Sequence, residues 1–462
     1  MNVTSKENTS RKFIINCFFV LLSFGLLGCL ILKHYAGATA DDTFFVLQLI
    51  NYICFILWFF VCIYSDRRVV PFIIFTYQIF LLLLLYSYYT YYIGNSLGIN
   101  PNDALFYQNF NEKIRQLPFS EALNAIWNEQ RIEHSIGDFG FPLVRYFISK
   151  FFFFLDYEGI NFVMLFVNAV ANTFASLYLY KLARFFLNEE NSKICMILWG
   201  LSSALVWISG SGLKDSIFSC ITLISLYYMQ SIFEGKRSFR TYFNFYLFLF
   251  LTIFFRIFTF LFIFFTYIAR KYLKRLFFNF YVLGMIIFII LAYVGTDIFA
   301  NIMPQLGALK LARNLNLEKS FGTASFFTNT MNFCLAWVST IPAFYPWAEF
   351  RNLYVVTYSI VKFYFSFFFI FCFLKVLLNK EKKLYPIMLV LFFNIILTIV
   401  SVTSLEYRFA LPVVYLYYIF ILYLFENEDK WLCIFNRKIS LGVANLIVAP
   451  ICLVLFVYYN IH

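Results

Sequence analysis

The stretch YFNFYLFLFLTIFFRIFTFLFIFFTYIA, residues 242–269, decides the fold. It carries a single charge, Arg256, and is longer than the roughly 20 apolar residues that one membrane-spanning helix needs. Basic residues tend to remain on the cytoplasmic side of a membrane. A single crossing would separate the two basic clusters that flank the stretch, so it is predicted to form two short helices that turn near Arg256. The flanking residues are Lys236, Arg237 and Arg240 before it and Arg270, Lys271, Lys274 and Arg275 after it.

The rest of the chain shares this composition. Of its 462 residues, 62% are hydrophobic, 23% are aromatic and only 13% are charged, and the mean hydropathy is +0.77. Soluble domains are about 25% charged, so the composition excludes a soluble enzyme, a nucleic-acid binder and a disulfide scaffold. The net charge of +12 reflects short basic loops between apolar runs rather than a nucleic-acid partner.

The sequence therefore predicts an all-α, polytopic integral membrane protein with about thirteen transmembrane helices, within a range of 11–14. Two of them form the 242–269 hairpin. The other apolar runs lie at 13–33, 43–64, 71–93, 160–182, 193–210, 216–233, 276–295, 353–376, 384–403, 409–425 and 440–459. The chain divides into two N-terminal spans (1–70), a membrane core (71–425), and a C-terminal cytoplasmic loop with a last span (426–462).

Basic residues set the orientation. Seven segments that would share the cytoplasmic side hold 22 of the 36 Lys and Arg residues, as the positive-inside rule requires. This places the N-terminus in the cytoplasm. The seven segments are 1–12, 65–70, 181–193, 234–241, 270–275, 375–383 and 426–438.

Two segments on the opposite side, 94–159 and 296–352, are too long to be simple connectors and too aromatic to be disordered. In the first, a helix over 103–117 would place Asp103, Tyr107, Phe110, Ile114 and Leu117 on one face. This pattern predicts a membrane-parallel helix on the outer leaflet. We expect two further segments to lie at the membrane interface, a short helix over 120–130 and the run 141–156.

Several charged residues fall at the predicted outer edge of the membrane, where charges tend to face cavities and mark function. Asp103 is the one acidic residue on the apolar stripe, and it is equally compatible with a charge at the start of a helix. The other candidates are basic or acidic side chains that would line the outer face. They are Lys214, Arg256, Glu406, Arg408, and the pair Lys310 and Arg313 on one helical face, which would grip phosphate or lie on anionic lipid. For Lys214 and Arg408 the alternative is that the side chain only extends along the apolar surface to place its charge at the membrane interface.

The layout resembles that of GT-C-type membrane glycosyltransferases and of O-antigen-type polymerases. The residues that carry the resemblance are NDALFY at 102–107, GFPLVRYF at 140–147, the span from 160, and SLEYRFALP at 404–412. In these families an acidic residue stands near the start of a long first outer loop, which membrane-parallel helices follow. Asp41 and Asp42, after the first helix, are rivals of Asp103 for that acidic position.

The resemblance implies an enzyme of the bacterial inner membrane that assembles surface polysaccharide, such as O-antigen, capsule or exopolysaccharide. A polyprenyl-linked sugar or oligosaccharide would be the donor at the outer face, a glycan the acceptor, and membrane lipid the surroundings. Asp103 would be the general base. Arg256, Arg408 and Lys214 would stabilise the departing phosphate, with Lys310 and Arg313 as further donor contacts and Glu406 orienting the acceptor or Arg408.

No cofactor is expected, and a divalent metal is compatible but not required. His34, His134 and His462 are scattered, and none of the ten cysteines forms a CxxC motif. The competing function is a flippase for lipid-linked oligosaccharide, which also needs a basic cavity. Flippases usually show internal repeats and short loops, whereas this chain has two long outer loops.

Overall fold

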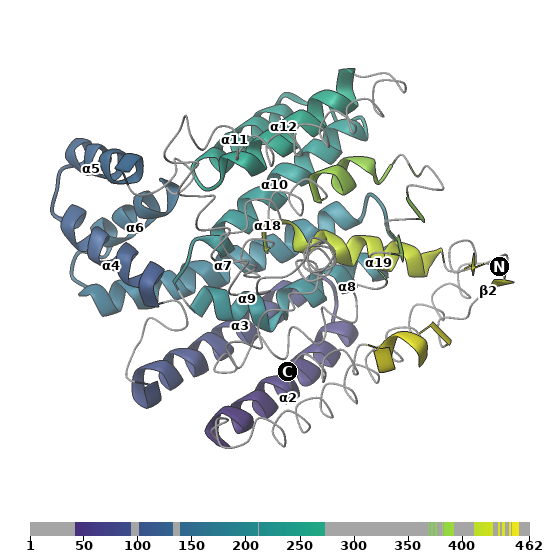
Figure 1. Cartoon of the computed structure of the whole chain (residues 1–462), viewed down its shortest axis with the longest axis horizontal. Coiled ribbons are helices and arrows are strands. Elements are labelled where there is room, and N and C mark those ends of the chain that lie inside the picture. Colours follow the sequence, from purple (N-terminus) through teal and green to yellow (C-terminus); the bar gives the residue numbers. More distant parts are fainter. Residues whose placement is uncertain are drawn as a thin grey trace, which may run out of the picture.

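The computed structural model describes the central part of the chain and pieces of its C-terminal part (Figure 1). These residues are helical apart from two short antiparallel strands, β1 (Cys433–Ile434) and β2 (Arg437–Lys438). The described residues are 42–93, 101–132, 139–210, 212–272, 368, 371–372, 375–376, 381, 383–391, 411–427, 433–434, 437–438, 443–444 and 446–451.

The helices follow the predicted apolar runs. The first two are α2 (Asp42–Tyr64) and α3 (Val70–Ser87), which a π-helix continues over Tyr88–Ile93. Three helices lie in the segment predicted to be the first outer loop, and they are called the outer-loop helices below: α4 (Pro101–Arg115), α5 (Phe119–Ile132) and α6 (Gly140–Phe151). The core helices are α7 (Tyr157–Ala183), α8 (Glu189–Gly200), α9 (Ser203–Gly210), α10 (Asp215–Phe233), α11 (Phe239–Ile253), α12 (Ile257–Tyr272), α18 (Leu411–Val414) and α19 (Leu416–Glu426).

Three of these helices are long and apolar enough to cross a membrane: Val70–Tyr91, Tyr157–Ala183 and Asp215–Phe233. The apolar helices Ile53–Tyr64 and Leu416–Glu426 are shorter. The chain is thus a helical, membrane-embedded protein. The total of about thirteen spans stays a prediction, because the runs at 13–33 and 276–295 lie outside the described residues.

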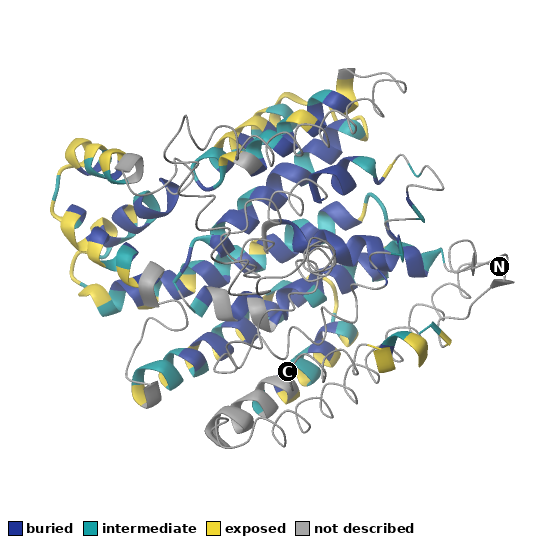
Figure 2. Ribbon diagram, viewed as in Figure 1, coloured by how far each residue is buried: buried dark blue, intermediate teal, exposed yellow. Residues whose placement is uncertain are grey.

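The centre of the bundle is built on α7, which buries one face against its neighbours, and α10, most of whose residues are buried. Figure 2 shows this centre as buried, with exposed residues gathered on α5 and along the outer edges of the bundle. Many of the exposed residues are large and apolar, including Phe72, Phe166, Phe174 and Phe250. Such side chains are costly to expose to water, and they are suited to face lipid.

The stretch 242–269 forms a hairpin, as the sequence predicts. Helix α11 starts at an N-cap, Ser238, whose side chain accepts from the backbone N–H of Thr241. The helix ends at Ile253, the chain turns over residues 254–256, and α12 runs back. Arg256 therefore sits at the tip of the hairpin.

The predicted span 193–210 is instead interrupted, and this corrects the sequence analysis. Helix α8 ends at Gly200 and α9 starts at Ser203. The break frees backbone carbonyls inside an apolar bundle, where an unpaired carbonyl is costly. Side chains of α3 satisfy them: Gln78 Nε2 donates to the Gly200 carbonyl at 2.9 Å and the Tyr77 hydroxyl donates to that of Leu201 at 3.2 Å.

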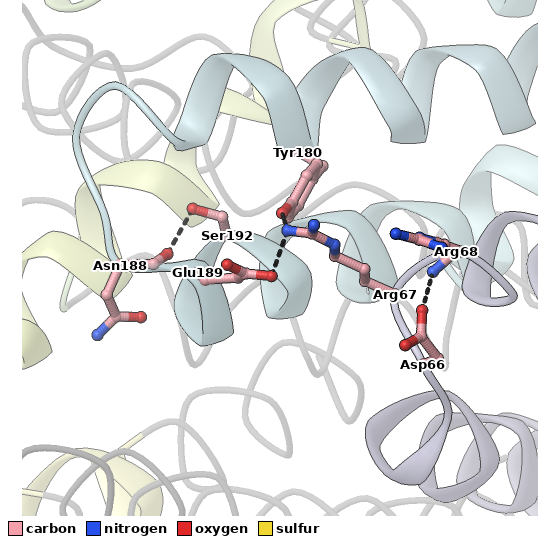
Figure 3. A network of polar contacts seen from close by, with 7 residues as sticks. All are labelled: Asp66, Arg67, Arg68, Tyr180, Asn188, Glu189 and Ser192. Carbon is pink, nitrogen blue, oxygen red and sulfur yellow. Dashed lines mark hydrogen bonds and ion pairs between the residues drawn. The ribbon is translucent and has the colours of Figure 1, made fainter. Parts of the chain in front are cut away.

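Segments predicted to share the cytoplasmic side meet at one end of the bundle. Arg67, in the α2–α3 turn, pairs with Glu189 at the start of α8 and donates to the Tyr180 hydroxyl at 3.3 Å (Figure 3). Glu426, at the end of α19, accepts from the backbone N–H of Asn188 at 3.1 Å. Lys383 lies 3.9 Å from Glu234, which links the 375–383 and 234–241 segments. Helices α4, α5 and α6 gather at the opposite end (Figure 1).

The amphipathic helix α4 departs from its predicted role on the lipid surface. Its apolar stripe packs against protein, because Phe110 and Ile114 join a cluster with Ala122 and Ile126 of α5 and Tyr146 of α6. An apolar stripe must be shielded from water, and packing against a neighbouring helix shields it as well as lipid does. The outer-loop helices therefore form a small packed layer of their own.

Candidate functional site

The candidate site is centred on an ion pair at the loop-helix end of the bundle. Arg256 Nη2 lies 3.0 Å from Asp215 Oδ1, and the two side chains are 20% and 3% exposed. Asp215 is the first residue of α10, and Arg256 comes from the hairpin tip. The guanidinium also lies over the ring of Phe218, 5.6 Å from its centroid. A cation held over an aromatic face and beside a carboxylate is strongly fixed in position.

The loop before α10 sets the position of Asp215. Gly212 has φ +64°, a conformation that glycine adopts without strain, and its N–H donates to the Ser209 carbonyl at 3.1 Å. Asn168 of α7 donates to the carbonyls of Ser209 and Leu213 at 3.2 and 3.3 Å. A buried amide thus anchors the loop from within the bundle. Lys214 follows as the N-cap residue of α10 and is half-buried beside Asp215.

Helix α6 docks directly on the hairpin tip. The Gly140 N–H donates to the Phe254 carbonyl at 2.8 Å. A Cβ atom at Gly140 would lie 2.8 Å from Cε2 of Phe255 and 3.1 Å from the Phe254 carbonyl oxygen, so a larger residue would force these neighbours to move. The next residue, Phe141, is fully buried and meets the Tyr107 ring of α4 edge-on, with centroids 4.8 Å apart. The first outer loop therefore covers the region beside Arg256.

The structure brings together part of the predicted set. Arg256 and Lys214 flank Asp215, and Asp103 lies in the first turn of α4, one turn before Tyr107. The side chain of Asp103 is not among those the structure describes. Four other predicted residues fall outside the described residues altogether: Glu406, Arg408, Lys310 and Arg313. Their places in the site stay predictions.

Two buried charged residues were missing from the predicted set. Asp215 stands next to Lys214 in the sequence, but nothing local reveals its pairing with a residue 41 positions away. Arg145 of α6 is 2% exposed, and its Nη2 donates to Asn161 Oδ1 at 2.7 Å. The signal for Arg145 was a charge on the apolar face of a short amphipathic helix, FPLVRYF.

Metal ligation stays open. Within the part of the chain that the structure describes, no group of three or more His, Cys, Asp or Glu side chains is placed to hold a metal ion. The cysteines described there, such as Cys220 in α10, are free and buried, as expected of small core residues.

No protein-family model matches the sequence, and neither a curated protein nor a solved structure matches it.

Proposed function

We propose that this protein is a glycosyltransferase or polymerase of surface-polysaccharide assembly in the bacterial inner membrane. It would take a polyprenyl-linked sugar or oligosaccharide as donor at the outer face and extend a glycan acceptor. The N-terminus would lie in the cytoplasm. The observation that carries the proposal is the Arg256–Asp215 pair, with Lys214 beside it, at the end of the bundle that the outer-loop helices cover.

The chemistry of this pair suits a phosphate-linked donor. The phosphate of such a lipid sits at headgroup level, and a guanidinium binds it through parallel charge-assisted hydrogen bonds. Asp215 holds Arg256 in a fixed direction, which lowers the reorganisation needed when charge develops on the leaving phosphate. Lys214 adds a second positive charge at the same helix start.

The proposed reaction is direct displacement at the anomeric carbon. The acceptor oxygen forms the new glycosidic bond while the bond between the anomeric carbon and the phosphate oxygen breaks. The phosphate leaves with the electron pair, and Asp103 takes the proton of the acceptor hydroxyl. Arg256 and Lys214 stabilise the departing phosphate. Arg408, Glu406, Lys310 and Arg313 are further proposed contacts.

A flippase for lipid-linked oligosaccharide is the second candidate. The interruption between α8 and α9 favours it, because broken membrane helices often mark the binding sites of transporters. The two functions differ in the step that a defective protein blocks, so one variant separates them.

Asp103→Asn tests the proposal. The change keeps the size of the side chain and removes the base, which lowers rates by ~10²–10⁴-fold. In cells that depend on this protein, lipid-linked precursor should then accumulate on the outer face and the polymer should shorten or disappear. A flippase variant would instead trap precursor on the cytoplasmic face.

Asp156→Asn is the matched control. Asp156 caps α7 by accepting from the Gly159 N–H at 2.8 Å, and asparagine caps helices equally well. This variant should extend glycan normally. Unchanged polymer yield and chain length in Asp103→Asn would refute Asp103 as the base and direct the search to Asp41, Asp42 or Glu406.

A further inference from the structure

Arg145 is a buried charge without a matching countercharge among the described residues. Its side chain is 2% exposed, and Figure 2 shows buried residues along α6. Its hydrogen-bond partner, Asn161 of α7, is a neutral amide. A guanidinium has five N–H donors, and Nε of Arg145 has no partner within the described residues. An ion in such surroundings is strongly destabilising unless something compensates it.

The neighbouring amides are arranged to receive a cation. Asn161 Nδ2 donates to Gln108 Oε1 of α4 at 2.9 Å, so the carbonyl oxygen of Asn161 is left to face Arg145. Tyr107, one residue before Gln108, is close enough to the guanidinium of Arg145 to interact with it electrostatically. Burial lowers the pKa of Arg145 to about 10, which leaves the side chain charged at neutral pH. The amides orient the charge but do not neutralise it.

Two other arginines of the described residues are held by different partners. Arg115 of α4 donates through Nη2 to the carbonyls of Phe153 and Leu155 and thereby ties α4 to the end of α6. Arg256 is paired with Asp215. Arg115 is thus held by two backbone carbonyls and Arg256 by a carboxylate. Arg145, the most deeply buried of the three, has one neutral amide oxygen as its hydrogen-bond acceptor.

We propose that Arg145 is an anion-binding residue that takes a phosphate group of the substrate, at a position separate from Arg256. Arg145 belongs to α6 and Arg256 to the hairpin tip, and these two elements meet where the Gly140 N–H donates to the Phe254 carbonyl. The identity of the ligand as a lipid-linked phosphate rests on the proposed function. The anion site itself rests on the burial and hydrogen bonding of Arg145.

The test measures thermal unfolding of the purified full-length protein in detergent, with and without two probes, farnesyl phosphate and inorganic phosphate. A bound phosphate should raise the melting temperature of the wild type. Arg145→Gln keeps a donor for Asn161 and removes the charge. Without a probe this variant should melt at a higher temperature than the wild type, because an uncompensated charge is gone. Its affinity for the probe should fall by ~10–100-fold.

Arg115→Gln is the matched control. It removes a structural arginine of the same layer, so it should lower the melting temperature and keep the probe-dependent shift. Arg145→Lys covers the case in which the glutamine variant fails to fold. It retains a positive charge without the forked geometry, and it should bind the probe about tenfold more weakly than the wild type.

A wild type that responds to neither probe, or an Arg145→Gln or Arg145→Lys variant that binds as tightly as the wild type, overturns the proposal. Response to farnesyl phosphate alone assigns the site to a lipid-linked phosphate, and an equal response to inorganic phosphate assigns it to the free ion. If Arg145→Gln loses probe binding while Asp103→Asn extends glycan normally, the anion site stands and the proposed reaction falls.

Discussion

Removing the charge of Asp215 should destabilise the protein, because it leaves the partly buried Arg256 beside a neutral group in place of a carboxylate. Asp215→Asn is the sharpest change, since asparagine keeps the size of the side chain and an oxygen acceptor. Only the negative charge that faces Arg256 Nη2 at 3.0 Å is lost.

The size of the effect follows from burial. Breaking a fully buried ion pair by removing one partner costs about 3–5 kcal/mol. Asp215 is 3% exposed but Arg256 is 20% exposed, so water recovers part of the loss. We expect Asp215→Asn to lower the free energy of unfolding by about 2–4 kcal/mol. The pair Arg67–Glu189 is the internal contrast: its side chains are 46% and 50% exposed, and Glu189→Gln should cost less than about 1 kcal/mol.

The assay is unfolding by SDS titration in mixed micelles, followed by circular dichroism. The double variant Asp215→Asn with Arg256→Gln should be more stable than the sum of the two single effects predicts, because it removes both charges of the 3.0 Å pair together. Equal and small losses in Asp215→Asn and Glu189→Gln would refute the reasoning. Strict additivity in the double variant would refute it too, since independent sites do not couple.

Three further predictions follow from the packing and the topology. Gln78→Leu should lower the free energy of unfolding by about 1–3 kcal/mol, because the buried Gly200 carbonyl loses its donor. The control is Thr76→Val, an exposed position on the same helix, which should change the free energy of unfolding by less than about 0.5 kcal/mol. Gly140→Ala should cost about 1–3 kcal/mol through its clash with Phe255, and unchanged SDS stability would show that α6 does not dock on the hairpin tip. Reporter fusions at 120 and 320 should be extracytoplasmic and fusions at 237 and 380 cytoplasmic, and a cytoplasmic signal at 120 would place Asp103 in the wrong compartment.

The part of the fold that charge and hydropathy control was predictable from the sequence. Basic clusters on both sides of 242–269 required a hairpin, and the structure turns at Arg256. The deciding property here, the charge pattern on either side of the stretch, belongs to the local sequence.

Features that depend on distant partners were not predictable in this way. The run 193–210 is continuously apolar, and its break at Gly200 depends on Tyr77 and Gln78, which lie far away in the sequence. The apolar stripe on α4 was predicted to face lipid. Sequence periodicity identifies a helix face that avoids water, but it does not show whether lipid or another helix covers that face. For the same reason, the charge on the apolar face of FPLVRYF did not reveal that Arg145 is buried or that Asn161 is its hydrogen-bond partner.

The break between α8 and α9 also constrains the order in which the protein is made. The two carbonyls that the break frees accept hydrogen bonds from side chains that precede them by 122 and 124 residues. These donors therefore leave the ribosome first. When α8 enters the bilayer, α3 is already there to receive it, and the broken segment need not wait in lipid with unpaired backbone groups. A rearranged gene that encoded α8 and α9 ahead of α3 would specify the same contacts, but the insertion machinery would have to hold an unsatisfied helix until its partner arrived.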